Sequence, residues 1–285
     1  RESTNQSDPD GLILLTMADS DTSNNTATGE EIQWAKAIKE AALADDTLKK
    51  LTDFEYLQHA IVAKDKVQKA LIRIKRMQDF KETYDLEGGG TFEDGIKRLK
   101  KFISVHPGLF LSVGKDTRDR MVFVMNFTCF DAKSIKTKED WNTTMGTFYY
   151  MFNSAQANVQ AIREGVGWVC ECKGVGWNNF NLEAEKRAAE FYSNAYPIRI
   201  KQMAMLDPPF VFHIMFSLVK IFMSKKVRSV VCMMGKEKFL EENKKVLTKD
   251  MLEAATGRTS TEEKFLEAAE KLLKERLQNS ASLVL

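Results

Sequence analysis

The sequence is short of histidine and cysteine, and this shortage bears on its chemistry. Its 285 residues include only three histidines and four cysteines, and none of these residues stand at the spacing of metal ligands. No G-x-x-x-x-G-K-[ST] phosphate loop and no G-x-S-x-G nucleophile motif occurs either. We therefore expect no metal, no other cofactor and no enzymatic activity.

Neither an excess of charge nor a long apolar run is present. The chain has 42 Lys and Arg residues against 40 Asp and Glu residues, a net charge of +2, which argues against a nucleic-acid partner. No apolar run is long enough to span a bilayer, and the polar N-terminus lacks the order of a secretory signal. The cysteines stand in apolar surroundings without the spacing of a disulfide framework. Together these features predict a cytoplasmic protein, peripheral to membranes if it contacts them.

Composition and periodicity divide the chain into four parts. Residues 1–28 are rich in Ser, Thr, Asn and Asp, which predicts a disordered tail. Residues 29–105 repeat apolar side chains at helical spacing and predict an N-terminal all-helical module. Residues 106–258 form the main domain, and residues 259–285 are expected to form a C-terminal amphipathic helix.

The main domain alternates short apolar runs with helical stretches. Strands are expected at residues 121–127, 167–172, 200–206 and 227–233. Helical patterns cover residues 143–163 and 182–195 between them. Strand and helix in alternation predict an α/β fold with a mainly parallel sheet covered by helices.

Residues 208–223 are the most informative segment. After two prolines they have helical length, and the only polar side chains form one narrow stripe of His213, Ser217 and Lys220. Such a helix is either an ordinary core helix or a lid, with one apolar face over a ligand cavity and the other available to a membrane. The basic sequence 224–228 (SKKVR) follows at once and suits anionic headgroups.

Residues 196–201 (YPIRIK) and 205–228 closely resemble the signature stretch of the CRAL-TRIO lipid-binding family. The resemblance is greatest to the branch that contains tocopherol transfer protein and cellular retinaldehyde-binding protein. Residues 114–124 and 165–174 are similar to two of the family's strands, and the helices of residues 29–85 resemble its N-terminal module. The resemblance implies an apolar cavity above the sheet, closed by a mobile gate helix.

The resemblance also implies which side chains bind the ligand. The implied cavity wall consists of Met145, Phe148, Phe152, Val166, Cys170, Phe191, Tyr192, Tyr196, Ile200 and Met203. The gate helix is expected to add Phe212, Met215, Phe216 and Val219.

A basic cleft for phosphoinositide headgroups is a further implication of the resemblance. The residues on or beside the matching positions are Arg199, Lys201, Lys225, Lys226 and Arg228. The family's arginine-rich turn is replaced by Leu57–Ile61 (LQHAI), so one expected headgroup contact is missing.

Three hypotheses of different classes follow. The leading one is a carrier that binds a single hydrophobic ligand, a lipid or isoprenoid-like molecule, and transfers it at anionic membranes by opening of the gate helix. The alternative is an interaction or regulatory module of the same fold, in which Phe148 and Phe152 fill the cavity. An enzyme would need a polar group in the pocket, for which Glu171 and His213 are the candidates.

Overall fold

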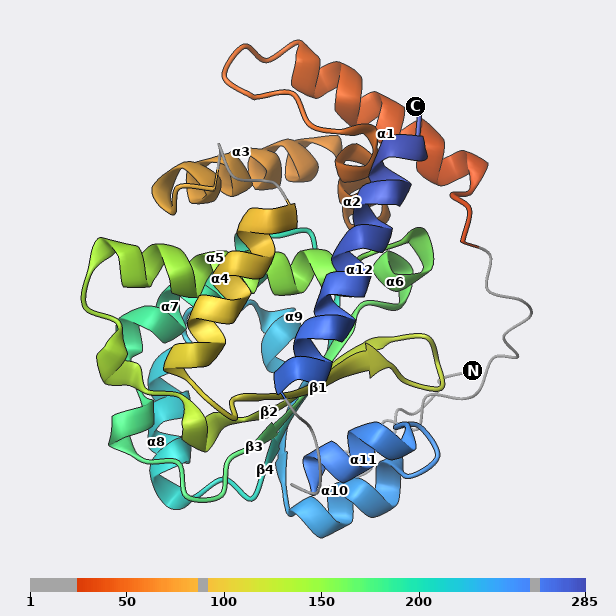
Figure 1. The fold of residues 1–285 in the computed structure, drawn as a ribbon. Helices are drawn as coiled ribbons and strands as arrows, with labels where there is room; N and C mark the ends of the chain where they lie inside the picture. The colour runs from red at the N-terminus through yellow and green to blue at the C-terminus, as the bar shows by residue number, and fades with distance from the viewer. Residues whose placement is uncertain (1–24, 87–91, 257–261) are drawn as a thin grey trace, which may run out of the picture.

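A five-stranded sheet lies at the centre of the protein, in a computed structural model that describes residues 25–86, 92–256 and 262–285 (Figure 1). The strands are β1 (Phe110–Lys115), β2 (Met121–Asn126), β3 (Val166–Glu171), β4 (Ile200–Leu206) and β5 (Val231–Met234). They lie in the order β1-β2-β3-β4-β5; β1 is antiparallel to β2, and the other pairs are parallel. The expectation of a mainly parallel sheet covered by helices is confirmed.

Two strand predictions need correction. The run predicted at residues 227–233 begins as a helix, because the Ser224 side chain accepts a hydrogen bond from the Val227 N–H and caps α9 (Lys225–Arg228). The strand starts only at Val231. Strand β1 was not among the predicted runs, and its partly exposed residues do not form a continuous apolar run.

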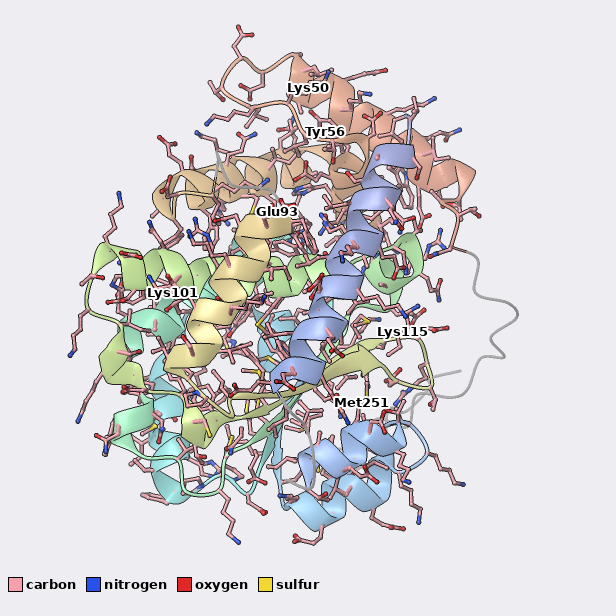
Figure 2. All side chains as sticks on the ribbon, viewed as in Figure 1. Lys50, Tyr56, Glu93, Lys101, Lys115 and Met251 are labelled. Carbon is pink, nitrogen blue, oxygen red and sulfur yellow. The ribbon has the colours of Figure 1, made fainter. Side chains whose placement is uncertain are left out.

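Alternating side chains of the strands build two cores on opposite faces of the sheet. Val122 and Val124 of β2 face the first core, with α10 (Lys236–Asn243) and α11 (Lys249–Ala255). Met251 of α11, labelled in Figure 2, belongs to this core. Phe123 and Met125 point to the other face and join the larger core.

Helices cover the larger core. They are α4 (Phe92–Val105), α5 (Lys138–Ala155), α7 (Leu182–Glu190), α8 (Phe210–Val219) and α12 (Glu262–Ser282). A short π-helical turn, η4 (Phe191–Ala195), continues α7, and the 3-10 turns are η1 (Phe127–Cys129), η2 (Ala132–Ser134) and η3 (Trp177–Asn179). The helix predicted at 143–163 is divided into α5 and α6 (Val159–Glu164).

The N-terminal helical segment has a third core of its own. It is built by α1 (Gly29–Leu43), α2 (Asp53–Ala63) and α3 (Val67–Thr83), together with Val159 and Ile162 of α6. Thr28 and Thr52 start α1 and α2 with capping boxes, each exchanging hydrogen bonds with a glutamate three residues on. The helical segment continues to α4, whose buried residues belong to the larger core.

The remaining predictions on organisation fall largely outside the described residues. The predicted disordered tail is described only from residue 25 onward, and the boundary between 258 and 259 lies in an undescribed stretch. None of the helices in the described ranges combines the length and the apolar character needed to cross a membrane.

Candidate functional site

An apolar cavity of about 120 Å³ lies between the sheet and α8. Three neighbouring strands form its floor in register, because Met125 of β2 stands beside Cys170 of β3, which stands beside Met205 of β4. The rest of the lining comes from Phe127, Phe148, Trp168, Phe180, Glu185, Ala188, Tyr192, Met203, Phe212, Met215, Phe216, Val219 and Met223. The wall is therefore mostly aromatic and sulfur-containing, which suits an adaptable site for an apolar molecule.

Helix α8 covers this cavity and is apolar on both of its faces. Phe212, Met215 and Val219 are buried toward the cavity. On the outer side Phe210 is 81% exposed, and Ile221, just past the helix end, is 69% exposed. A helix with apolar side chains in water on one side and over a cavity on the other has the construction expected of a lid.

Eight of the predicted ligand-binding residues line the cavity. They are Phe148, Cys170, Tyr192, Met203, Phe212, Met215, Phe216 and Val219. The other six are buried away from its lining: Met145, Phe152, Val166, Phe191, Tyr196 and Ile200.

Phe152 shows why these six residues do not reach the cavity. Its ring stacks on Phe191 with centroids 5.4 Å apart and on Trp168 at 5.4 Å, so it forms part of a solid aromatic core behind the cavity. The filling of the space beneath α8 by Phe148 and Phe152, which the interaction-module hypothesis requires, is therefore absent at Phe152. Phe148 contributes only to the wall.

Sequence reasoning missed half of the lining. The missed residues are Met125, Phe127, Trp168, Phe180, Glu185, Ala188, Met205 and Met223. The two-residue period of a strand could have found Trp168, because it shares a strand face with Cys170. No sequence pattern pointed to Glu185 as a cavity residue, because alternating acidic and basic residues on a helix are typical of a solvated face.

The cavity wall has the chemistry of a binding site for an apolar molecule. Burial raises the pKa of the Cys170 thiol to about 12 and that of Cys172 further, so both thiols stay protonated and unreactive. The two side chains considered for an enzyme do not line the cavity: Glu171 pairs with Lys236, and His213 is exposed. No cluster of potential metal ligands occurs within the described part of the chain.

A cluster of cationic side chains surrounds Lys226 of α9, the helix that follows α8 in the chain. Desolvation lowers the pKa of Lys226, and so do four nearby cations, those of Arg199, Lys201, Lys69 and Arg73. We call these five residues the basic cluster. In the described ranges, none of the five forms an ion pair with a carboxylate.

Arg73, like Lys69, is a member of the basic cluster that the sequence analysis did not identify. Its Nε and Nη1 are buried and donate no hydrogen bond within the described residues, and desolvation lowers its pKa. By contrast, the Arg199 guanidinium donates hydrogen bonds to the backbone carbonyl oxygens of Arg163 and Ile61. Arg73 and Lys69 thus bring two cations from the helical segment, although the arginine-rich turn at Leu57–Ile61 is missing. The predicted Lys225 and Arg228 are exposed on α9.

Comparisons with known proteins agree with this geometry. The mouse and human tyrosine-protein phosphatase non-receptor type 9 are 22% identical over 91 and 87 residues, which is 32% and 30% of this chain but only 15% of theirs. The crystal structure of Sfh5 superposes with a TM-score of 0.50 at 12% identity, covering 89% of this chain and 99% of that one, a likeness of fold alone. The family model of the CRAL/TRIO domain matches residues 106–257, more than half of the chain. The chain therefore belongs to the CRAL/TRIO domain family.

Proposed function

We propose that the protein carries one hydrophobic molecule, a lipid or isoprenoid-like ligand, beneath α8 and transfers it at membranes when α8 moves outward. CRAL/TRIO domains typically bind lipophilic ligands, and no covalent chemistry is part of the proposal. The observation that carries it is a lid helix with one apolar face over a cavity and another in solvent.

The size of the cavity supports movement of the lid. Pockets for small molecules usually enclose about 300–1,000 Å³, and the space beneath α8 is about 120 Å³. A lipid therefore enters only if the wall retreats. The outer residues of α8 are exposed, so an outward displacement of α8 breaks no packing on that side.

The outer face of α8 supports a membrane as the place of opening. Phe210, Ile214 and Leu218 follow each other at four-residue spacing along one exposed stripe. Transfer of a large apolar side chain from water into lipid gains about 1.5–3 kcal/mol. Three or four such side chains can offset the contacts that α8 loses when it leaves the cavity.

The basic cluster supports an anionic membrane, with a phosphoinositide as the headgroup of highest charge. Among the described residues, the five cations form no ion pair with a carboxylate, although Glu31 and Glu164 attract Arg199 without forming an ion pair. The cations repel one another, and a phosphate group relieves this repulsion. The resemblance of residues 196–228 to the tocopherol-transfer branch supports the same reading. The cluster lies where α9 follows the lid, so headgroup binding and lid opening can occur together.

The test is whether the protein retains and transfers an apolar molecule. We expect the purified chain, incubated with a cell lipid extract, to show one bound lipid per protein by native mass spectrometry. Transfer between vesicles is expected to be faster with anionic than with zwitterionic acceptors. If no apolar molecule is retained, the carrier proposal fails and the interaction-module alternative is favoured. Turnover of the bound molecule would instead indicate an enzyme.

A further inference from the structure

Besides the Tyr192 hydroxyl and the Cys170 thiol, two polar groups line the cavity without a hydrogen-bond partner among the described residues. The first is the carboxyl group of Glu185 on α7. No hydrogen bond or ion pair to this carboxyl group is found among the described residues, whereas the neighbouring Glu183 pairs with Arg187 at 2.7 Å on the outer side. Desolvation is the cause that raises the pKa of Glu185 to about 7.

The second group is the indole N–H of Trp168 on β3. The side chain is 5% exposed, and its Nε1 is buried without an acceptor within the described residues. The ring cannot readily turn to find one, because it stacks on Phe152 and meets Tyr192 edge-on at a centroid distance of 5.6 Å. A buried donor without a partner costs about 1–3 kcal/mol. Trp168 also lines the cavity, so a ligand atom that enters when the wall retreats can supply the missing acceptor.

We propose that Trp168 and Glu185 form the polar end of the ligand cavity and select a neutral lipid that carries a hydroxyl group. The ligand oxygen accepts the hydrogen bond of the Trp168 N–H, and its O–H donates to the Glu185 carboxyl group. This inference rests on the proposed carrier function and names the class of molecule carried.

Other lipid classes satisfy the pair less well. A hydrocarbon leaves both groups unpaired, and a fatty acid places a second carboxylate beside Glu185. A protonated amine pairs with Glu185 but has no lone pair for the Trp168 N–H. At pH 8, where the fatty acid is ionised and the amine is protonated, the hydroxyl group alone among these four classes serves a donor and an acceptor at the same time.

Four probes with sixteen carbon atoms test the selection: 1-hexadecanol, hexadecane, hexadecanoic acid and hexadecylamine. The affinity of each is measured by its displacement of a fluorescent apolar dye from the full-length protein. We expect hexadecanol to bind about 10- to 100-fold more tightly than hexadecane, as two hydrogen bonds imply. The acid is expected to bind more weakly than the alcohol at pH 8, and the amine is not expected to exceed the alcohol.

Variants assign the selection to the two side chains. Glu185→Met removes the acceptor and is expected to reduce the preference for hexadecanol over hexadecane by about 10-fold. Glu185→Gln keeps an acceptor oxygen, so it should retain most of this preference, and it should bind hexadecanoic acid more tightly than the wild type does. Trp168→Phe is expected to reduce the preference in the same way. Circular dichroism and hexadecane affinity show whether each variant keeps its fold and cavity.

The outcomes separate this inference from the carrier proposal. If no probe displaces the dye, the carrier function itself fails. If all four probes bind with affinities within about two-fold of one another, the cavity binds apolar molecules but Trp168 and Glu185 do not select among them. Preference for the amine, or an unchanged preference in Glu185→Met, also overturns the assignment.

Discussion

Arg276 in the last helix donates a hydrogen bond of 2.8 Å from its Nη2 to the side-chain oxygen of Gln58 in α2, 218 residues earlier. Its Nη1 donates to the carbonyl of Gln156 at 2.9 Å, and its guanidinium lies 5.0 Å from the ring centroid of Phe54. One buried cation thereby joins the helical segment, the sheet domain and α12.

Replacing Arg276 should therefore loosen all three parts. We expect Arg276→Ala to lower the free energy of unfolding by about 3–5 kcal/mol, because buried acceptors lose their donor. Chemical denaturation measures this loss. Lys274→Ala, which breaks an exposed pair with Glu270 and a cation–π contact with Phe92, is the control and should change stability by less than about 1 kcal/mol. Equal effects of the two variants would contradict the joining role.

Gly165 is required where α6 passes into β3. Its φ is +75°, and a Cβ atom built there would lie 2.1 Å from the carbonyl oxygen of Arg199. Gly165→Ala should destabilise the fold by at least about 1–3 kcal/mol and displace Arg199 in the basic cluster. Gly176→Ala, where nothing lies within 4 Å, should be nearly neutral. Comparison of the two melting temperatures checks this.

The exposed face of α8 should control transfer rather than ligand retention. In the double variant Phe210→Ser and Ile221→Ser, we expect vesicle binding to fall by at least about 10-fold, because two large apolar side chains no longer enter lipid. Ligand retention should persist, since neither residue lines the cavity. Leu43→Ser on α1, which removes a 53% exposed leucine elsewhere, is the control. Unchanged vesicle binding would rule out α8 as the membrane contact.

Arg73 should contribute to binding of anionic vesicles. We expect Arg73→Gln to weaken this binding about 5-fold at low salt, since a cation near an anionic surface contributes about 1 kcal/mol, and less at high salt. Lys75→Gln removes the same charge from the same helix, but Lys75 pairs with Asp79 at 2.9 Å, so its effect should be smaller. Sedimentation with phosphoinositide-containing vesicles distinguishes the two.

Glu185 should make stability depend on pH in the ligand-free protein. Its pKa is raised to about 7 from 4.5, so the folded state binds more protons between these values. The free energy of unfolding of the wild type, relative to Glu185→Gln, should be highest below about pH 4.5. It should fall as the pH rises to about 7, by at most about 3 kcal/mol and by less where solvent reaches the carboxyl group.

The groups near Glu185 do not obscure this titration. Cys170 and Cys172 on β3 and Tyr192 on η4 all have raised pKa values and stay neutral over the interval. Denaturation of both proteins at several pH values measures the difference. A constant difference from pH 4 to pH 8 would refute the perturbed carboxyl group.

Local patterns predicted the elements well where one side-chain period dominates. The run at Ile200–Leu206 became β4 with the same bounds. Met203 and Met205 turn to the larger core, whereas Ala204 and Leu206 turn to the core on the opposite face, which is the two-residue period of a strand. The prediction failed at Val227–Arg228, where the Ser224 cap starts a helical turn within residues of high strand propensity. Capping is a local hydrogen bond that apolar periodicity does not report.

The cavity wall could be predicted only in part. The gate-helix residues that the family resemblance implied lie on the lining, where Phe212, Met215, Phe216 and Val219 follow the three- to four-residue period of one helix face. Phe152 was expected on the lining but does not lie there. Its ring could face either the cavity or the aromatic core, and stacking with Phe191 selects the core. Which of two apolar neighbours a buried ring packs against depends on residues far away in the chain.

The sequence by itself determined most of the elements, the family signature of residues 196–228 and a helix too apolar for an ordinary surface. Only the tertiary structure decided that Met125, Cys170 and Met205 form one row, that Arg73 joins the basic cluster and that Glu185 lies on the cavity wall. The reason is that periodicity acts over neighbouring residues, whereas strand register and helix packing are set by contacts between distant ones.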